Sequence, residues 1–317
     1  MISVGLIGCG AVVHELYAKA LIGRSAYKVC FVCDTDPTQA ASAAVLFGAE
    51  AVSLEVLAEK AEAIIISTPP ATHAALVRAC LQPGRTIICE KPYMTTHKDA
   101  REICEESHAA GASLFVNHFR RVFPQLELAQ ELVGLGVIGE VTGFRASEGG
   151  RFIWKAVSRY TTRDPAGGVL WDTGSHTLDM ALFASGLDGS PDMGVEDVRV
   201  RRDKSEPSHD FRADFRLSVD GRGVDGRVHV SRKEALPNLV VISGTGGQVA
   251  FITGLDDRVR LTTATGSTVL HAERPYGHFM ECFDIQFRRI LLADRAGPMA
   301  AENFAGQIKL IETLTNA

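Results

Sequence analysis

The sequence predicts an α/β protein with two domains: an N-terminal doubly wound parallel sheet, followed by an α+β domain with a mostly antiparallel sheet. Three observations predict this class. Short apolar runs alternate with helical stretches as far as residue 117, a glycine pair follows the first run, and later segments alternate apolar and polar residues between turns. The first pattern is typical of parallel sheets with helical crossovers, and the last of antiparallel sheets with one solvated face. We therefore expect domains at 1–117 and 118–317.

The first domain is expected to alternate strands and helices. Five apolar runs are short enough for buried strands; they are Val4–Ile7, Val29–Cys33, Ala63–Ser67, Thr86–Cys89 and Ser113–Val116. The stretches between them repeat apolar residues at helical spacing; they are Val12–Ile22, Pro37–Phe47, Ala71–Leu81 and Lys98–Ala110.

The second domain is expected to begin with a helix from Pro124 to about Leu135 and a strand near Glu140. Period-two alternation then marks further strands; they are Val195–Arg202, Asp210–Val219, Val224–Ser231, Leu239–Ser243, Gln248–Thr253 and Asp257–Thr262. The glycine-rich run at 244–247 is interpreted as a hairpin turn, and Glu302–Thr313 as a closing helix.

Composition narrows the class of protein. A net charge of -5 gives no electrostatic reason to expect nucleic acid or an anionic membrane as partner. No run approaches the roughly 20 apolar residues of a membrane span, and the chain begins as a strand without a basic leader, so we expect a cytoplasmic protein. The seven cysteines fit core positions in a reduced compartment. No metal site is expected, because His176 and Asp179 lack a third nearby ligand in the sequence.

The segment from Gly8 to Val13 is the predicted phosphate-binding turn. Gly8, Cys9 and Gly10 follow a strand and open a helix, so their backbone amides can approach a pyrophosphate, with Ala11, Val12 and Val13 continuing the turn. Val13 stands where a third glycine is usual. Asp34 ends the second strand, where an acidic side chain binds the ribose 2′-hydroxyl, which favours NAD over NADP. The alternative for Asp34 is a simple turn residue.

Further motifs follow in order: Ser67-Thr68-Pro69-Pro70-Ala71-Thr72-His73, Glu90-Lys91-Pro92, Asn117-His118-Phe119-Arg120-Arg121 and Gly167-Gly168-Val169-Leu170-Trp171-Asp172-Thr173-Gly174-Ser175-His176. With the glycine turn, this ordered set resembles the Gfo/Idh/MocA oxidoreductase family over nearly the whole chain. The resemblance implies a Rossmann domain, then an α+β domain with a large open sheet whose exposed face packs against another subunit. A homodimer or homotetramer is therefore expected.

The resemblance also implies roles for individual residues. It places Thr68, Pro69 and Pro70 beside the dinucleotide, together with Glu90, Lys91 and Asn117. His73, at a helix start, is expected to contact the cofactor side or to cap the helix. Lys91 is implied to reach the reacting substrate oxygen, and Asp172 and His176 to complete the catalytic group.

These residue types suit oxidation of a secondary alcohol. A base must take the hydroxyl proton while a cation stabilises the developing alkoxide, and His176 and Lys91 supply these functions. Asp172 lies four residues before His176, so a helix would place both on one face. In isolation, Lys91 can equally be a solvated turn residue and His176 a satisfied interior histidine.

Substrate contacts are harder to assign. Arg120 and Arg121 either bind substrate hydroxyls or phosphate, or form ion pairs that tie the structure together. Four residues form a candidate substrate loop: Phe152, Trp154, Arg159 and Tyr160. Tyr93 and Trp171 depart from the residues usual in the family, which suggests a sugar-stacking or narrowed pocket, with a core role for Trp171 as the alternative.

The resulting prediction is an NAD-dependent oxidoreductase. It transfers a hydride between nicotinamide and a secondary alcohol, or the corresponding ketone, of a sugar, cyclitol or activated sugar. The alternatives are NAD-dependent glycoside cleavage through transient oxidation and a non-catalytic NAD-binding regulatory protein.

Overall fold

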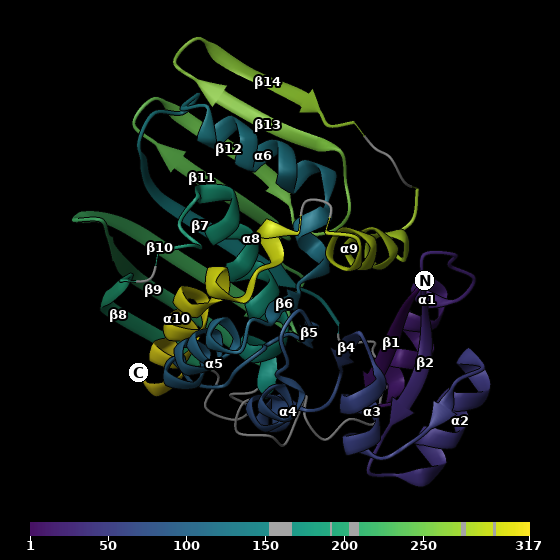
Figure 1. The fold of residues 1–317 in the computed structure, drawn as a ribbon. Coiled ribbons are helices and arrows are strands. Elements are labelled where there is room, and N and C mark those ends of the chain that lie inside the picture. Colours follow the sequence, from purple (N-terminus) through teal and green to yellow (C-terminus); the bar gives the residue numbers. More distant parts are fainter. Residues whose placement is uncertain (152–166, 191, 203–208, 274–276, 294–295) are drawn as a thin grey trace. The chain divides into compact units, whose positions relative to one another are not determined.

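The computed structural model describes residues 1–151, 167–190, 192–202, 209–273, 277–293 and 296–317. The chain divides into two compact units (Figure 1). Unit 1 comprises Met1–Phe119 and Tyr276–Glu302, and unit 2 comprises Arg120–Pro275 and Asn303–Ala317. Each is described separately below. Within the described residues, no helix has both the length and the apolar character needed to cross a membrane.

Unit 1 is built on the predicted parallel sheet. Its described residues form six strands in the order β3-β2-β1-β4-β5-β6, with every neighbouring pair parallel. The strands are β1 (Ile2–Ile7), β2 (Tyr27–Cys33), β3 (Glu50–Ala51), β4 (Ala63–Ile66), β5 (Thr86–Glu90) and β6 (Ser113–Asn117). Strand β3 was not predicted, because its two exposed residues show no hydrophobic pattern.

The helices of unit 1 are set by local signals. In α2, the Asp36 side chain accepts the amide of Thr38, Pro37 occupies the first turn, and Gly48 ends the helix with φ 61°. The helical segments up to this point in the chain are η1 (Val13–Tyr17), α1 (Ala18–Leu21), α2 (Pro37–Phe47), α3 (Leu54–Lys60), η2 (Pro70–Thr72), α4 (His73–Cys80), α5 (His97–Ala109) and η3 (Phe119–Val122), the last of which extends into unit 2.

The chain returns to unit 1 near its end, which the division at residue 117 did not anticipate. Helix α9 (Glu281–Leu291) belongs to unit 1 and is followed by η5 (Gly297–Met299) and η6 (Ala301–Phe304), which crosses into unit 2. Phe287 of α9 packs edge-on against Tyr17, with ring centroids 5.1 Å apart, and Gln286 donates to the Val116 carbonyl. These buried contacts explain why α9 joins the first unit.

Unit 2 contains the predicted, mostly antiparallel sheet. Its described strands number eight and follow the order β14-β13-β12-β11-β7-β10-β9-β8, and the one parallel pair among them is β10 with β7. They are β7 (Val141–Gly149), β8 (Gly194–Arg202), β9 (Asp210–Val219), β10 (Arg222–Ser231), β11 (Leu239–Gly244), β12 (Gly247–Ile252), β13 (Arg258–Thr263) and β14 (Gly266–His271). Gly244 and Gly247 close the β11–β12 hairpin, as predicted.

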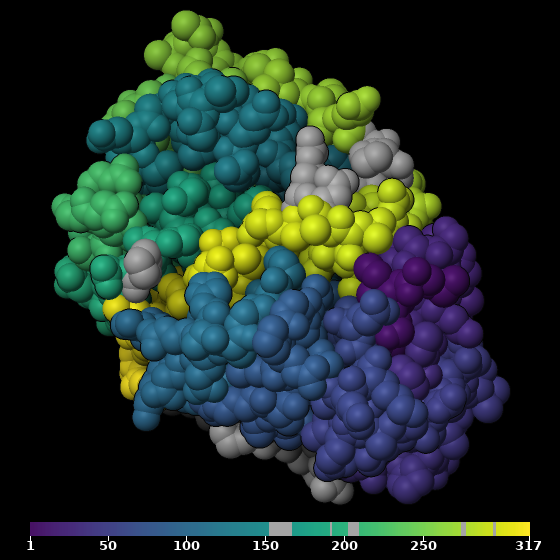
Figure 2. Space-filling model, in the orientation of Figure 1, coloured from purple at the N-terminus to yellow at the C-terminus, as the bar shows by residue number. Residues whose placement is uncertain are grey.

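One face of this sheet is covered by helices and the other carries charges. Helix α6 (Pro124–Gly134) lies over β12 and β13, and α8 (Ser175–Ser185) lies over β7 and β11; the blue-teal residues of α6 cover this face in Figure 2. The described unit also contains η4 (Leu170–Gly174) and α10 (Ala305–Asn316). On the opposite face, Arg227 pairs with Asp214 across neighbouring strands.

Candidate functional site

The predicted cofactor residues of unit 1 lie along one edge of its sheet. Ile7 is in register with both Cys33 and Ile66, and Ile66 is in register with Cys89. The residues at and just after these strand ends are therefore neighbours along the carboxyl edge. They are Gly8, Asp34, Ser67, Thr68, Glu90 and Lys91, with Asn117 at the end of β6. Ligands of open parallel sheets bind at this edge.

The glycine turn is tightly fitted on one side and open on the other. Gly8 has φ +87°, and a Cβ atom there would lie 2.8 Å from the Thr68 Cγ2 atom. A Cβ atom on Gly10 would meet no atom within 4 Å. Val13 is fully buried and begins the π-helical turn η1. Gly8 is therefore needed by the fold, whereas Gly10 leaves space beside the backbone that a ligand can occupy.

Asp34 holds the glycine turn. Its carboxylate accepts the Cys9 amide at 2.6 Å and the Asp36 amide at 2.8 Å. Burial, and to a smaller extent the charge of Asp34, raises the pKa of the neighbouring Cys9 thiol to about 12, so this thiol stays protonated. Asp34 thus fixes the turn through the same carboxylate that was predicted to bind a ribose.

His73 is a buried structural link within unit 1. Its side chain has no exposed surface; Nε2 lies 2.8 Å from the Thr68 carbonyl oxygen and Nδ1 lies 3.1 Å from that of Tyr93. Burial lowers the pKa of His73. The imidazole therefore joins the Thr-Pro-Pro turn to the chain after Lys91, instead of facing solvent beside a cofactor.

Glu90 and Asn117 share a buried hydrogen-bond network with Tyr17. Tyr17 and Asn117 both donate to Glu90 Oε1, and the Lys91 amide donates to Glu90 Oε2 at 3.0 Å. Burial raises the pKa of the Glu90 carboxyl, and the hydrogen bond from Tyr17 and the charge of Lys91 oppose that rise. The network fixes the backbone from which the Lys91 side chain extends.

Asp172 and His176 lie in unit 2 on one continuous helix. Residues 168–185 are helical, with a π-helical section over η4 that passes into α8. Thr177 anchors α8 by donating to Glu148 of β7 at 2.8 Å, and Gln307 donates to the Ser175 carbonyl. The predicted helical spacing of Asp172 and His176 is thus present, with His176 buried.

Asp172 is held by a buried arginine that the sequence analysis did not identify. Arg232 Nη2 donates to Asp172 Oδ2 at 2.8 Å, and the Arg232 side chain is 3% exposed. Sixty residues separate the two in the chain, so no local pattern links them. Arg232 follows the end of β10, at a turn whose sequence shows no catalytic motif.

Arg120 and Arg121 both form ion pairs inside unit 2. Arg120 donates from Nη1 and Nη2 to the Glu148 carboxylate, at 2.6 and 2.8 Å. Arg121 is fully buried and pairs with Asp179 and Asp188 at 2.6 and 2.9 Å. Of the two roles considered for Arg121, this arrangement favours the structural one.

The aromatic residues proposed to narrow a sugar pocket are buried. Tyr93 is 1% exposed and its hydroxyl donates to the Ala100 carbonyl, so it belongs to the core of unit 1 and is not a stacking surface. Trp171 is 4% exposed, which favours the core alternative. The candidate substrate loop with Phe152, Trp154, Arg159 and Tyr160 lies outside the described residues.

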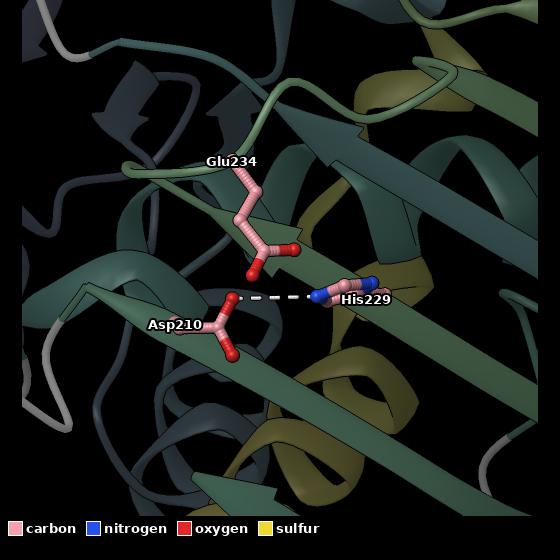
Figure 3. Close-up of side chains that lie close together, drawn as sticks. All are labelled: Asp210, His229 and Glu234. Atoms are coloured by element: carbon pink, nitrogen blue, oxygen red, sulfur yellow. Dashed lines mark hydrogen bonds and ion pairs between the residues drawn. The ribbon is translucent and has the colours of Figure 1, made fainter. Parts of the chain in front are cut away.

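Asp210, His229 and Glu234 gather near the end of β10. Their ligand atoms lie within 4.8 Å of one another, and Figure 3 shows the Glu234 carboxylate above the Asp210–His229 pair. Asp210 and His229 continue the series of ion pairs between β9 and β10. Arg212 is directly opposite His229 in the register, and its positive charge disfavours a metal cation here.

The sequence matches two models of one protein family. Residues 2–118 match the model described as an oxidoreductase family with an NAD-binding Rossmann fold, and residues 126–250 match the GFO/IDH/MocA C-terminal domain. The chain belongs to the Gfo/Idh/MocA oxidoreductase family. The family resemblance and the fold predicted from the motifs are both confirmed.

Curated Gfo/Idh/MocA relatives have diverse substrates in their names. Inositol 2-dehydrogenase of Rhizobium meliloti is 28% identical over 57% of this chain and 54% of its own length. D-glucoside 3-dehydrogenase of Escherichia coli is 28% identical over 58% of this chain and 54% of its own length. Mouse trans-1,2-dihydrobenzene-1,2-diol dehydrogenase is 27% identical over 77% of this chain and 72% of its own length. The chain thus spans little more than half the length of the first two relatives.

Solved structures of similar proteins share the fold of this family member. An Agrobacterium radiobacter oxidoreductase in complex with NAD⁺, L-tartaric acid and magnesium gives a TM-score of 0.77 at 23% identity, covering 98% of this chain and 94% of that one. A 3-ketoreductase from Actinomadura kijaniata, in complex with NADP and TDP-benzene, gives a TM-score of 0.76 at 20% identity. The match covers 98% of this chain and 96% of that one.

Proposed function

We propose that this protein is an NAD-dependent oxidoreductase acting on a secondary alcohol, or the corresponding ketone, of a sugar, cyclitol or activated sugar. The observation that carries the proposal is the helix of unit 2 that bears Asp172 and His176, with the Asp172 carboxylate held by Arg232. The names of the inositol and glucoside dehydrogenase relatives support the substrate class.

The residues of unit 1 fit a dinucleotide. The open space beside Gly10, the carboxylate of Asp34 and the carboxyl edge of the sheet are the features that such a cofactor requires. When bound, the nicotinamide accepts or gives the hydride. The Gly8 and Cys9 amides already donate to the Cys33 carbonyl and the Asp34 carboxylate, so the turn from Gly10 onward would hold the pyrophosphate, and Asp34 the adenosine ribose.

The proton chemistry falls to the protein. In oxidation, His176 takes the proton of the reacting hydroxyl, and in reduction it returns a proton to the ketone oxygen. The Lys91 ammonium stabilises negative charge on that oxygen. Asp172 accepts a hydrogen bond from the imidazole or from a neighbouring substrate hydroxyl, which orients the reacting group.

A substrate panel tests this proposal. Purified protein is incubated with NAD or NADP and with inositols, free sugars, sugar phosphates and nucleotide sugars, while absorbance of the reduced nicotinamide is followed. NADH formation with one substrate group supports the proposal. Glycoside loss without net NADH would instead support cleavage through transient oxidation. NAD binding with no reaction in either direction, using alcohols or ketones, would support the regulatory alternative.

The two glycines of the turn are expected to respond differently to alanine. Gly10→Ala should leave the melting temperature unchanged, because the new methyl group meets no protein atom, but weaken NAD binding about tenfold or more by occupying the space of the pyrophosphate. Gly8→Ala should also destabilise the fold by at least about 1–2 kcal/mol, since its φ of +87° is left-handed. Calorimetric titration and thermal unfolding measure both effects. Unchanged NAD affinity in Gly10→Ala would exclude this turn as the pyrophosphate site.

Asp34 is expected to set the preference for NAD. Because a carboxylate repels a 2′-phosphate, the wild type should use NAD at least about tenfold more efficiently than NADP, as measured by the ratio of kcat/KM values. Asp34→Ser should narrow that ratio while retaining a side-chain acceptor for the Cys9 amide. Asp36→Ser, which changes the N-cap of α2, is the matched control and should keep the wild-type ratio. A wild type that prefers NADP would contradict this assignment.

A further inference from the structure

The contact between Arg232 and Asp172 joins a buried cation to a partly exposed carboxylate. The side chain of Arg232 is 3% exposed and that of Asp172 is 22% exposed, with 2.8 Å between Nη2 and Oδ2. A guanidinium removed from water needs an anionic partner, and its hydrogen bond to a carboxylate is charge-assisted. The Asp172 carboxylate therefore provides a negative charge beside Arg232, and part of its side chain remains exposed.

Backbone contacts fix Arg232 independently of Asp172. The Arg232 amide donates to the His209 carbonyl at 2.7 Å. The amides of Lys233 and Glu234 both donate to the Ser231 hydroxyl, which closes a turn directly after β10. The guanidinium is thus carried by a turn whose geometry is set by the sheet.

Gly149 allows this turn to lie close to β7. An added Cβ atom at Gly149 would be 2.5 Å from the Glu234 carbonyl oxygen and 2.6 Å from Leu236 Cγ. The Gly149 carbonyl also accepts the Leu236 amide, and Gly149 is in register with Ser231. The segment after Arg232 is therefore packed against two strands, which limits movement of the turn.

We propose that Arg232 is a positioning residue for the reaction, acting through Asp172; this inference rests on the catalytic role given to Asp172 above. Arg232 donates to one carboxylate oxygen of Asp172 at 2.8 Å, which makes that carboxylate a fixed hydrogen-bond acceptor. The division of roles follows: His176 moves the proton, and Asp172 orients the imidazole or a substrate hydroxyl.

A double-mutant cycle tests the inference. Arg232→Gln and Arg232→Lys are each made in the wild type and in Asp172→Asn, with kcat, KM and the NAD dissociation constant measured for each. Arg232→Gln should lower kcat by up to about 100-fold through misplacement of Asp172, and Arg232→Lys, which keeps the cation, should recover part of the loss. The NAD dissociation constant should stay within about twofold, since the cofactor residues lie in unit 1. In the Asp172→Asn background, Arg232→Gln should cost little more, because residues that act as one unit are non-additive.

Glu234→Gln is the matched control. It lies on the same turn, but its carboxylate faces Asp210 and His229 (Figure 3), so kcat should be unchanged.

An equal loss of kcat from Arg232→Gln in both backgrounds would overturn the inference, as would wild-type kcat in a folded Arg232→Gln protein. Wild-type kcat in Asp172→Asn would overturn the proposed role of Asp172 itself. If Arg232→Gln does not fold, Arg232→Lys carries the same cycle. A crystal structure of Arg232→Gln gives a readout without substrate: an unmoved Asp172 carboxylate in this variant contradicts positioning by Arg232.

Discussion

Replacing Lys91 with methionine is expected to lower kcat for hydride transfer by about 100- to 1,000-fold, the range found when one group that stabilises a developing oxyanion is removed. Methionine keeps an unbranched apolar side chain and removes the ammonium. The backbone of residue 91 should stay in place, because Glu90 holds its amide and is itself held by Tyr17 and Asn117. The loss should therefore appear in kcat and leave the fold intact.

Two controls separate chemistry from binding in the Lys91→Met experiment. Lys98→Met changes an exposed lysine in α5 that pairs with Glu102, and it should retain wild-type kcat. NAD titration of Lys91→Met shows whether the cofactor site survives. Wild-type turnover in a Lys91→Met protein that binds NAD would mean that Lys91 takes no part in the reaction and is only a turn residue before Pro92.

The parts of the structure that local sequence determines were predicted well. Each strand of the parallel sheet other than β3 contains an apolar run, and α2 was predicted with the observed bounds because Asp36, Pro37 and Gly48 mark its ends. The same holds for the hairpin at 244–247. Strand β14 was not predicted. Five of its six residues are exposed, so its sequence does not alternate between a buried and a solvated face.

The parts that depend on long-range contacts were not predictable. Tyr17 joins Glu90 across 73 residues and Arg232 joins Asp172 across 60, and neither pair has a shared motif. The return of α9 to unit 1 depends on how Phe283 and Phe287 pack against Tyr17, although the helix itself has a clear apolar face. A single sequence gives the local elements, but tertiary packing decides which buried polar groups meet.

Removing the charge of Arg121 is expected to have the largest effect on stability. Its guanidinium pairs with the buried carboxylate of Asp179 and the partly buried carboxylate of Asp188. It also lies 3.9 Å from the ring centroid of Phe304 and 4.8 Å from that of Phe183. Arg121→Met leaves the buried Asp179 and the partly buried Asp188 without this cation. We expect a loss of about 3–5 kcal/mol in the free energy of unfolding at neutral pH, as is found when one partner of a buried ion pair is removed.

The loss should depend on pH in a defined direction. Burial raises the pKa of the Asp179 and Asp188 carboxyls, and the charge of Arg121 opposes this rise. In Arg121→Met the opposing charge is gone, so the folded-state pKa values rise further above their unfolded values. A raised carboxyl pKa means that the folded state binds more protons, and stability falls as pH increases through that range. The deficit should therefore be smaller at pH 5 than at pH 8.

Urea denaturation at both pH values measures this prediction, and two further variants assign its cause. Arg101→Met removes an exposed partner of Glu105 and should cost less than about 1 kcal/mol. Adding Asp179→Asn to Arg121→Met removes one uncompensated charge, so the double variant should be more stable at pH 8 than the single one. A deficit under 1 kcal/mol, or one that grows in acid, would mean that the buried carboxylates do not depend on Arg121. The arginine would then be available for the substrate role that the sequence left open.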